Sequence, residues 1–300
     1  MGTMSEAPPR MDGRTIAAAT MKMVALAALA IVAAIQSASR AFAEASPSSG
    51  NNRPFIVFDA TLYKGKPNLM AFGLQPIIAG NNFWRPGHST DNVDDEGVRQ
   101  EFGHYRNSNG LYYIDIEKWP ILFASPAERA ASINKLDRVL TLARSTAPKL
   151  RIGFYGVLPG TAYWPLVMRD ARLQQWRDED STDLMPLAQK VDAVFPSLYT
   201  YYDDIEGWKT YARMTLEETR RFKKPVYAFL WPQFHDSNEK IRGQYLPVGF
   251  WRAELELCYQ MADGIVIWGG WTATWDEHAD WWLETKAFMT AHGIAVSPAT

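Results

Sequence analysis

Short apolar runs, rich in β-branched and aromatic residues, alternate with longer helical stretches along most of this chain. Seven strands are predicted, at Pro54–Ala60, Gln75–Ala79, Leu111–Glu117, Leu150–Val157, Ala193–Tyr199, Pro225–Trp231 and Gly264–Gly269. The spacing of apolar residues predicts helices at Pro126–Ala147, Ala171–Lys190, Ile205–Phe222, Phe250–Ala262 and Asp280–His292. Strands that alternate with helices pair in parallel through βαβ crossovers, so the sequence predicts an α/β protein.

The predicted strands are nearly continuous in hydrophobicity, which indicates that both faces of each strand are buried. Seven such strands favour a closed, TIM-like (β/α) barrel, which commonly forms one domain of about 200–250 residues. An open doubly wound sheet is the alternative, and it usually carries a glycine-rich phosphate loop after its first strand. The residues at that place are Asp59-Ala60-Thr61-Leu62, so neither a nucleotide nor any other cofactor is expected.

The composition limits the classes of partner. A net charge of −2 offers no basic surface for nucleic acid. The single cysteine, Cys258, excludes an intramolecular disulfide and a CxxC site, and it is expected to be a small buried hydrophobe. The five histidines show no H-x-H or HExxH spacing, so no metal site is expected. The 12 tryptophans and 13 tyrosines either fill a large core or line a site for flat ligands such as sugar rings.

The first 43 residues are interpreted as a secretory signal peptide. The apolar run Val24–Ile35 follows Lys22 and precedes Ala41-Phe42-Ala43, which is the order of a basic region, an apolar region and a cleavage site. The run is shorter than the about 20 residues that a membrane span needs, so no transmembrane segment is expected after cleavage; an uncleaved anchor is the alternative. Residues 44–53 are then a flexible lead-in, residues 54–300 a single catalytic barrel, and the protein is expected to be secreted or periplasmic.

Polar and aromatic side chains stand at the ends of the predicted strands, where a packed core does not require them. Active sites of barrels are built at the carboxyl ends of the strands. The side chains at or near these ends are Asp59, Asp115, Glu117, Tyr155, Tyr199, Trp231 and Trp268. Such a convergent set predicts a ligand site at the mouth of the barrel. The long polar stretch Asn81–Gly110 is interpreted either as a rim loop over this site or as a mobile surface excursion.

Asp115 and Glu117 are the central feature of the predicted site. Residues two apart on a strand point to the same side, with Cα atoms about 6.6 Å apart. Two carboxylates that close do not both ionise freely near neutral pH, and apolar neighbours add desolvation, so one pKa is expected to be raised. A carboxylic acid that stays protonated can protonate a leaving group while its ionised neighbour stabilises charge. The alternative is a pair that caps the next turn or binds Lys118.

The residues around this pair resemble animal and venom hyaluronidases. The strand that carries their acidic D-x-E pair, followed by a tryptophan, is similar to LYYIDIEKWP. Their other strands resemble, in the same order, PFIVFDAT, RIGFYGVLP, AVFPSLY, PVYAFLW and ADGIVIWGGW. The resemblance spans about residues 54–271 and identifies the chain as a distant, bacterial-type secreted relative. It implies a distorted barrel with fewer than eight strands, in agreement with the seven predicted here.

The resemblance also implies an activity: that of a retaining endo-glycosidase acting on an N-acetylhexosamine-containing polysaccharide or oligosaccharide by substrate assistance, without an enzyme nucleophile. The family's general acid/base corresponds to Glu117. The aspartate that positions and polarises the substrate's N-acetyl group corresponds to Asp115, and the acetamido oxygen attacks the anomeric carbon. Tyr199 corresponds to the tyrosine that holds the acetamido group, and Trp268 to the tryptophan that packs on its methyl.

Several positions depart from the family pattern. The characteristic disulfides are absent, and Ile116 stands where the family has a tryptophan inside D-x-E. Pro120 replaces the arginine after the later tryptophan, and Pro232 replaces a tyrosine near the end of the sixth strand. These differences leave open whether the chain prefers an anionic, uronate-containing substrate.

Further residues are candidates for substrate binding. The segment Tyr201–Asp204 either lines a subsite, with Tyr202 as a contact, or caps the next helix, and Trp271 is a candidate for stacking on sugar. A second hypothesis is a glycosidase that acts on glycans without acetamido groups, with Asp59 or Asp203 as nucleophile. A third is a non-catalytic carbohydrate-binding barrel, although both acids of the D-x-E pair are retained.

Overall fold

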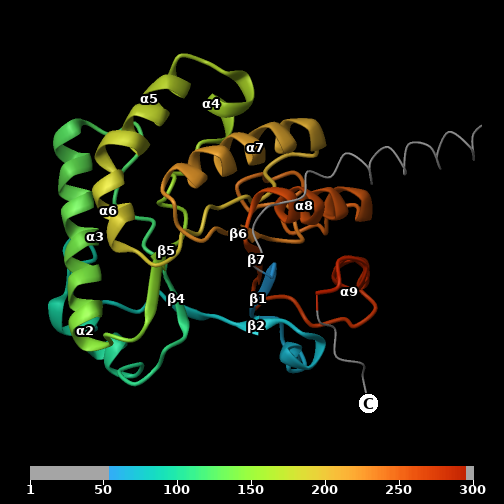
Figure 1. The fold of residues 1–300 in the computed structure, drawn as a ribbon, viewed down its shortest axis with the longest axis horizontal. Coiled ribbons are helices and arrows are strands. Elements are labelled where there is room, and N and C mark those ends of the chain that lie inside the picture. The colour runs from blue at the N-terminus through green and yellow to red at the C-terminus, as the bar shows by residue number, and fades with distance from the viewer. Residues whose placement is uncertain (1–53, 295–300) are drawn as a thin grey trace, which may run out of the picture. The chain divides into compact units, whose positions relative to one another are not determined.

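Short parallel strands occupy the middle of the fold, and helices pack around them (Figure 1). The computed structural model describes residues 54–294, so the predicted signal peptide (1–43) and lead-in (44–53) lie outside the described residues. The strands are β1 (Ile56–Thr61), β2 (Gln75–Pro76), β3 (Ile78–Gly80), β4 (Leu111–Ile114), β5 (Arg151–Phe154), β6 (Tyr227–Leu230) and β7 (Gly264–Gly269). The α-helices are α2 (Asp95–Gly103), α3 (Pro126–Thr146), α4 (Tyr163–Met168), α5 (Arg172–Asp178), α6 (Met185–Lys190), α7 (Ile205–Arg221), α8 (Val248–Met261) and α9 (Asp280–Ala291). A 3-10 helix, η1 (Leu69–Phe72), and a π-helix, η2 (Glu179–Asp183), complete the set for this part of the chain.

The strands close into a ring. One sheet has the order β2-β1-β7-β6 and the other β3-β4-β5, and all pairs are parallel. Because β2 and β3 follow one another in the segment Gln75–Gly80, this segment joins β1 to β4. On the opposite side, parallel bridges at Phe195 and Ser197 place residues 193–200 between β5 and β6. The prediction of an α/β barrel of parallel strands is therefore confirmed.

Two predicted strands differ from the prediction. Ala193–Tyr199 forms isolated bridges instead of a regular strand. Pro196 lies at its centre and has no N–H to donate, although its carbonyl still accepts the N–H of Phe229 at 2.9 Å. The predicted strand Gln75–Ala79 also contains a proline, Pro76, and it is divided into β2 and β3.

The inside of the ring is filled by aromatic side chains. Phe195 is fully buried at its centre, and its ring centroid lies 6.2 Å from that of Tyr113 and 6.0 Å from those of Tyr227 and Phe229. These residues alternate along the chain with residues of the outer core, among them Ile114, Val194 and Ala228. The interior of the ring is therefore a packed core and not an open channel.

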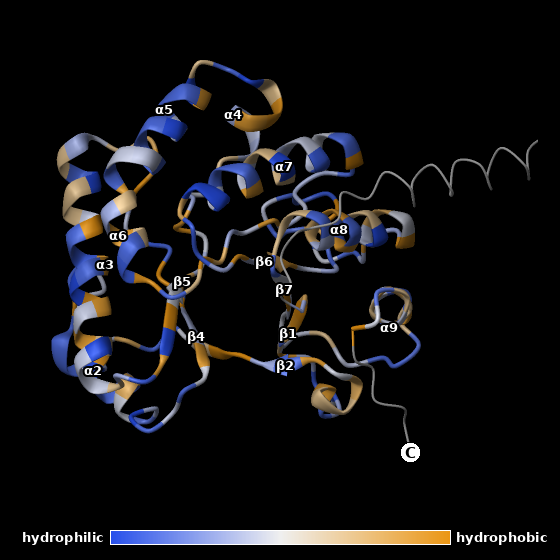
Figure 2. Cartoon of the chain, in the orientation of Figure 1, coloured by the Kyte–Doolittle hydropathy of each residue, from blue (hydrophilic) through white to orange (hydrophobic). Residues whose placement is uncertain are grey.

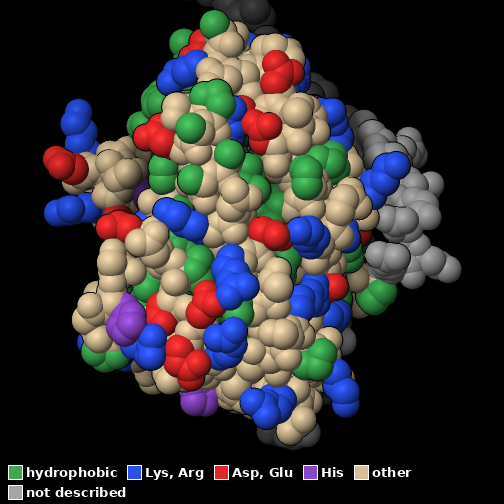
Figure 3. Space-filling view, turned by 90° about the vertical axis from the view of Figure 1, so that its left-hand side faces the viewer, with side chains coloured by type: hydrophobic (Ala, Val, Ile, Leu, Met, Phe, Trp, Pro, Cys, Tyr) green, Lys and Arg blue, Asp and Glu red, His purple; other side chains and the backbone are tan. Residues whose placement is uncertain are grey.

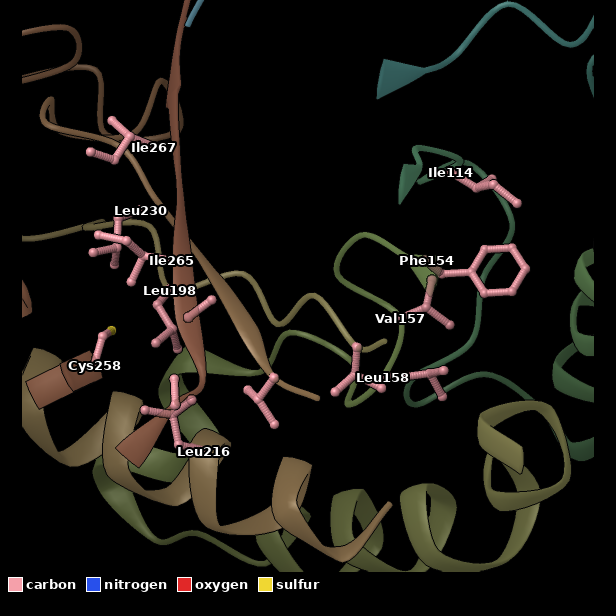
Figure 4. Packing of buried hydrophobic residues seen from close by; sticks show 14 of the residues in the cluster. Ile114, Phe154, Val157, Leu158, Leu198, Leu216, Leu230, Cys258, Ile265 and Ile267 are labelled. Atoms are coloured by element: carbon pink, nitrogen blue, oxygen red, sulfur yellow. The ribbon is translucent and has the colours of Figure 1, made fainter. Parts of the chain in front are cut away.

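The second core lies between the ring and the helices. Figure 4 shows outward-facing strand residues meeting side chains of α7 and α8, such as Leu216 and Cys258. Leu230, Ile265 and Ile267 are labelled on this side of the view, whereas Ile114 and Phe154 lie on its other side. Burial raises the pKa of the Cys258 thiol, and the side chain is fully buried, as expected of a small hydrophobe.

Four of the five predicted helices are found, as α3, α7, α8 and α9. Ser125 and Glu128 form a capping box at the start of α3, where the Ser125 hydroxyl accepts the Glu128 N–H at 3.3 Å and the carboxylate accepts the Ser125 N–H at 3.1 Å. Asp204 caps α7 by accepting the N–H of Gly207 at 2.9 Å. Asp204 therefore has the capping role that the sequence left open.

Two other stretches are corrected. The predicted helix Ala171–Lys190 is divided into α5, η2 and α6, because Pro186 at the start of α6 lacks the N–H that a continuous helix needs. The predicted loop Asn81–Gly110 contains α2, which begins after Asp94. The Asp94 carboxylate accepts the Gly97 N–H at 3.2 Å and so caps this helix.

Helices such as α5 and α7 carry many hydrophilic residues (Figure 2). On the face formed by α2 and α3, acidic and basic side chains are interspersed (Figure 3). One exposed pair joins Arg138 of α3 to Asp95 of α2, and another joins Lys190 of α6 to Asp137 of α3 at 2.6 Å. Within residues 54–294, none of the helices combines the length and the apolar character needed to cross a membrane.

Candidate active site

Asp115 and Glu117 lie at the carboxyl end of β4, beside the mouth of the ring. β4 ends at Ile114 and not at Glu117, which corrects the predicted strand end. The backbone N–H of Asp115 still donates to the Gly80 carbonyl of β3 at 2.8 Å, so the pairing extends one residue beyond the strand. Both carboxyl groups line one cavity of about 480 Å³. The structure thus brings the two acids to one site.

Four aromatic side chains form a wall of this cavity. Tyr155, Tyr199, Trp231 and Trp268 follow β5, the segment 193–200, β6 and β7, and all four line the same cavity. Tyr199 is central, with its ring centroid 5.8 Å from Tyr155, 5.7 Å from Trp231 and 6.0 Å from Trp268. The two indoles meet edge to face at 4.7 Å. The four aromatic residues that the sequence placed at or near strand ends therefore line one cavity.

Hydrogen bonds fix parts of this wall. The hydroxyl groups of Tyr155 and Ser197 lie 3.1 Å apart, and the Trp231 indole N–H donates to Gln233 at 3.0 Å. Burial raises the pKa of both Tyr155 and Tyr199 well above the ordinary value of a phenol. The phenols are therefore neutral hydrogen-bonding groups in a preformed site.

Burial also changes the acid pair. Asp115 is half-buried, and desolvation, with a smaller effect of the Glu117 charge, raises the pKa of Asp115 to about 6. Glu117 lies nearer to solvent, and its pKa is raised by desolvation. The expectation that one carboxyl pKa is raised agrees with this, but loss of water is a larger cause than repulsion between the acids. The pair can therefore retain a proton at mildly acidic pH.

Three predicted substrate contacts lie outside the cavity lining. Asp59 binds Lys66 at 2.6 Å and the Thr61 hydroxyl at 2.6 Å, and it faces away from the ring because it alternates with inward-facing Phe58. Tyr202 accepts a hydrogen bond from the Trp164 indole at 3.0 Å. Trp271 is 65% exposed beyond the end of β7. The structure therefore does not bring these three residues into the central cavity.

Other lining residues were not singled out from the sequence. Ser197 could have been found, because it alternates with Phe195 and Tyr199 in the same segment. His235 and Asp236 follow β6 in a loop, where no periodic pattern marks them. The imidazole of His235 lies 4.8 Å from the ring of Tyr201, which also lines the cavity, and burial lowers the pKa of His235.

The lining indicates the chemistry available to the site. The central cavity has aromatic faces, hydroxyl groups and carboxyl groups, and its described lining contains no lysine or arginine. No group of three or more His, Cys, Asp or Glu side chains is placed to hold a metal ion among residues 54–294. Aromatic faces suit the apolar side of a sugar ring, and a carboxylic acid beside them is suited to proton transfer.

Comparison with known proteins supports the fold. No protein-family model and no curated protein sequence matches this chain. The structure is similar to that of bee venom hyaluronidase, with a TM-score of 0.57 and 14% identity over 80% of this chain and 99% of that chain. It is also similar to bee venom hyaluronidase in complex with a hyaluronic acid tetramer, with a TM-score of 0.56 and 14% identity over 80% of this chain and 98% of that chain. The described chain thus has a fold like that of the bee venom enzyme.

Proposed function

We propose that the protein is a retaining endo-glycosidase that hydrolyses an N-acetylhexosamine-containing polysaccharide by substrate assistance. The observation that carries this proposal is the single cavity shared by Asp115, Glu117, Tyr199 and Trp268. The likeness in fold to bee venom hyaluronidase, one structure of which holds a hyaluronic acid tetramer, supports a ligand of the same class.

In this proposal Glu117 is the general acid and base. Its raised pKa favours the protonated form, which gives its proton to the glycosidic oxygen as the bond to the anomeric carbon breaks. The substrate's acetamido oxygen attacks the same carbon and forms a cyclic intermediate. Glu117 then takes a proton from the water that opens this ring, so the product keeps the configuration of the substrate and the enzyme regains its proton.

The remaining residues orient the acetamido group. Asp115 is the partner for the acetamido nitrogen, on which positive charge develops during the attack. Tyr199 offers a neutral phenol to the same group, and Trp268, held edge to face against Trp231, offers an apolar surface to its methyl. These roles are those that the resemblance implies for the matching positions.

A carboxylate nucleophile is the competing mechanism. Asp59 and Asp203 do not line the central cavity, whereas Asp236 does. A thiazoline mimic of the cyclic intermediate is expected to inhibit the enzyme competitively. A covalent glycosyl-enzyme trapped on Asp236 with a fluorinated substrate would instead overturn substrate assistance.

Replacement of Glu117 is the direct test of function. Glu117→Gln keeps the shape of the side chain but not its proton transfer, so kcat is expected to fall on the order of 10²–10⁴-fold. The measurement is the release of reducing ends from hyaluronan, chondroitin, chitin oligomers, peptidoglycan and neutral glucans. The control, Glu217→Gln, changes an exposed carboxylate on α7 that lies outside the cavity, and it is expected to leave kcat unchanged. Near-normal turnover by Glu117→Gln would exclude the assigned role.

We also propose that the mature protein is secreted or periplasmic. The support is the order of Lys22, the apolar run Val24–Ile35 and the small residues at Ala41-Phe42-Ala43. Mass spectrometry of protein recovered from the medium or periplasm is expected to find an amino terminus at Glu44. Recovery only from the cytoplasm, with residues 1–43 still attached, would contradict export.

A further inference from the structure

A second cavity adjoins the central one. It has a volume of about 690 Å³, and it shares Asp115, Ile116 and Glu117 with the central cavity. Its other described lining residues are Asn81, Asn82, Trp84, Thr90 and Lys118. β4 lies between β3 and β5, and the acid pair follows β4. On the β3 side of the pair is the second cavity, which residues after β3 line. On the β5 side is the central cavity, which residues after β5, β6 and β7 line. Asp115 and Glu117 therefore lie between two cavities.

Trp84 gives the second cavity a fixed flat surface. Its indole N–H donates to the Asn92 carbonyl at 2.7 Å, and its ring meets Trp119 edge to face at a centroid distance of 5.9 Å. Trp84 is only half-buried, so part of its ring still lines the cavity. The exposed amides of Asn81 and Asn82 lie on the same lining. A held indole beside amide groups suits a sugar ring with hydroxyl substituents.

Lys118 supplies the positive charge of this cavity, which Asp115 and Glu117 also line. Its ammonium nitrogen lies 4.8 Å from the centroid of the Trp84 ring. It is the lone lysine or arginine among the described residues that line either cavity. Lys66 binds the carboxylate of Asp59, whereas Lys118 forms no ion pair with any residue of 54–294. An unpaired ammonium beside an aromatic ring is free to bind an anionic substituent of a stacked sugar.

We propose that the second cavity is a saccharide subsite across the scissile bond from the central cavity. In it, Trp84 stacks on the sugar ring, and Lys118 binds a carboxylate or sulfate group that this sugar carries. The inference rests on the proposed function, since the acid pair defines where the bond is cut. Subsites on both sides of Glu117 let a polysaccharide run through the site and be cut internally.

The test uses the full-length protein and compares its KM values for hyaluronan and chitin oligosaccharides of equal length. Trp84→Ala is expected to raise KM about three- to tenfold for both hyaluronan and chitin oligosaccharides, because both lose the stacking surface, and Trp84→Phe is expected to restore most of the loss. Lys118→Gln is expected to raise KM about three- to tenfold for hyaluronan oligosaccharides and less than about twofold for uncharged chitin oligosaccharides. Lys118→Arg is expected to restore the preference. Circular dichroism checks that each variant is folded.

A matched lysine provides the control. Lys149 is exposed just before β5, at the opposite end of the barrel, so Lys149→Gln is expected to leave both KM values unchanged. Equal KM values for wild type and Trp84→Ala, or an equal rise for both substrates in Lys118→Gln, would overturn the subsite while leaving the proposed hydrolysis intact. If no polymer is cleaved but Trp84→Ala weakens oligosaccharide binding in calorimetry, the proposed function fails, and the second cavity is then a saccharide-binding site without a scissile bond.

Discussion

At the scale of single residues, Asp115 shows how a functional group costs stability. Its carboxyl group is half-buried beside aromatic side chains, and this loss of water is the main reason that its pKa rises to about 6. The unfolded chain carries an ordinary aspartate with a pKa of about 3.9. Ionised Asp115 is therefore better accommodated by the unfolded chain than by the folded one.

Removal of this charge is expected to stabilise the protein in a pH-dependent way. Since the folded pKa is raised, the group favours the folded state fully below about pH 4, and this contribution is lost as the pH rises through about 6. Asp115→Asn should accordingly be more stable than wild type by about 2–3 kcal/mol at neutral pH and no more stable near pH 3.5. Urea unfolding at the two pH values measures this difference.

Asp59 offers the control for this experiment. Its carboxylate binds Lys66 at 2.6 Å, so Asp59→Asn removes a favourable pair and is expected to lose up to about 1 kcal/mol at neutral pH. A gain of equal size in both variants would contradict the explanation from burial. So would the lack of any gain in Asp115→Asn at neutral pH.

At the scale of elements, β5 and the segment 193–200 approach each other closely at Gly153. A Cβ atom added at Gly153 of β5 would lie 2.2 Å from the Ala193 carbonyl oxygen and 2.7 Å from the Phe195 ring. The first of these is a backbone atom, which can move only if the segment moves. This segment also carries Tyr199 into the cavity. Glycine is therefore required for close approach, and the site depends on it.

Gly153→Ala is expected to push the segment away from β5. The overpacking should destabilise the protein by about 1–3 kcal/mol, and displacement of Tyr199 should lower kcat/KM. Thermal or urea unfolding and oligosaccharide hydrolysis measure the two effects. Gly249→Ala, at an exposed position of α8 with nothing within 4 Å of the added Cβ, is the control and should be neutral or stabilising by up to about 1 kcal/mol. Equal effects of the two substitutions would contradict the close-approach argument.

At the scale of the whole molecule, the closed ring couples the strands through one interior. Phe195 contacts Tyr113 from β4, Tyr227 from β6 and Phe229 from β6. Its neighbours therefore come from both sheets, which join through the bridges of the segment 193–200. A change at Phe195 is expected to affect the ring as a unit.

Phe195→Ala should destabilise the protein by about 3–5 kcal/mol, because it empties a fully buried position at the centre of the interior. Far-ultraviolet circular dichroism and tryptophan fluorescence should report one common transition, shifted to lower denaturant. Trp271→Ala, at a 65% exposed position, is the control and should change stability by less than about 0.5 kcal/mol. Separate transitions for the two probes would show that the two sheets unfold independently.

The sequence by itself determined the order of the elements and the position of the acid pair, because both depend on local patterns. Alternation, helical spacing and caps such as Ser125 are properties of neighbouring residues, and they predicted the parallel strands and four helices, α3, α7, α8 and α9, within residues 54–294. Local patterns failed where a proline interrupted an element, at Pro186 and Pro196. They also missed α2, a helix of nine residues inside a polar stretch that was interpreted as a loop, although Asp94 caps it.

Only the tertiary structure decided which strand-end side chains share a cavity. Tyr199 and Trp268 enter it, whereas Asp59, which is also near the end of a strand, binds Lys66 outside the ring. The direction of a side chain depends on the register in which the strands close, which no single strand encodes. The approach of Trp84 to Lys118 likewise depends on tertiary structure, because these residues follow β3 and β4, and the pairing of the two strands brings them together.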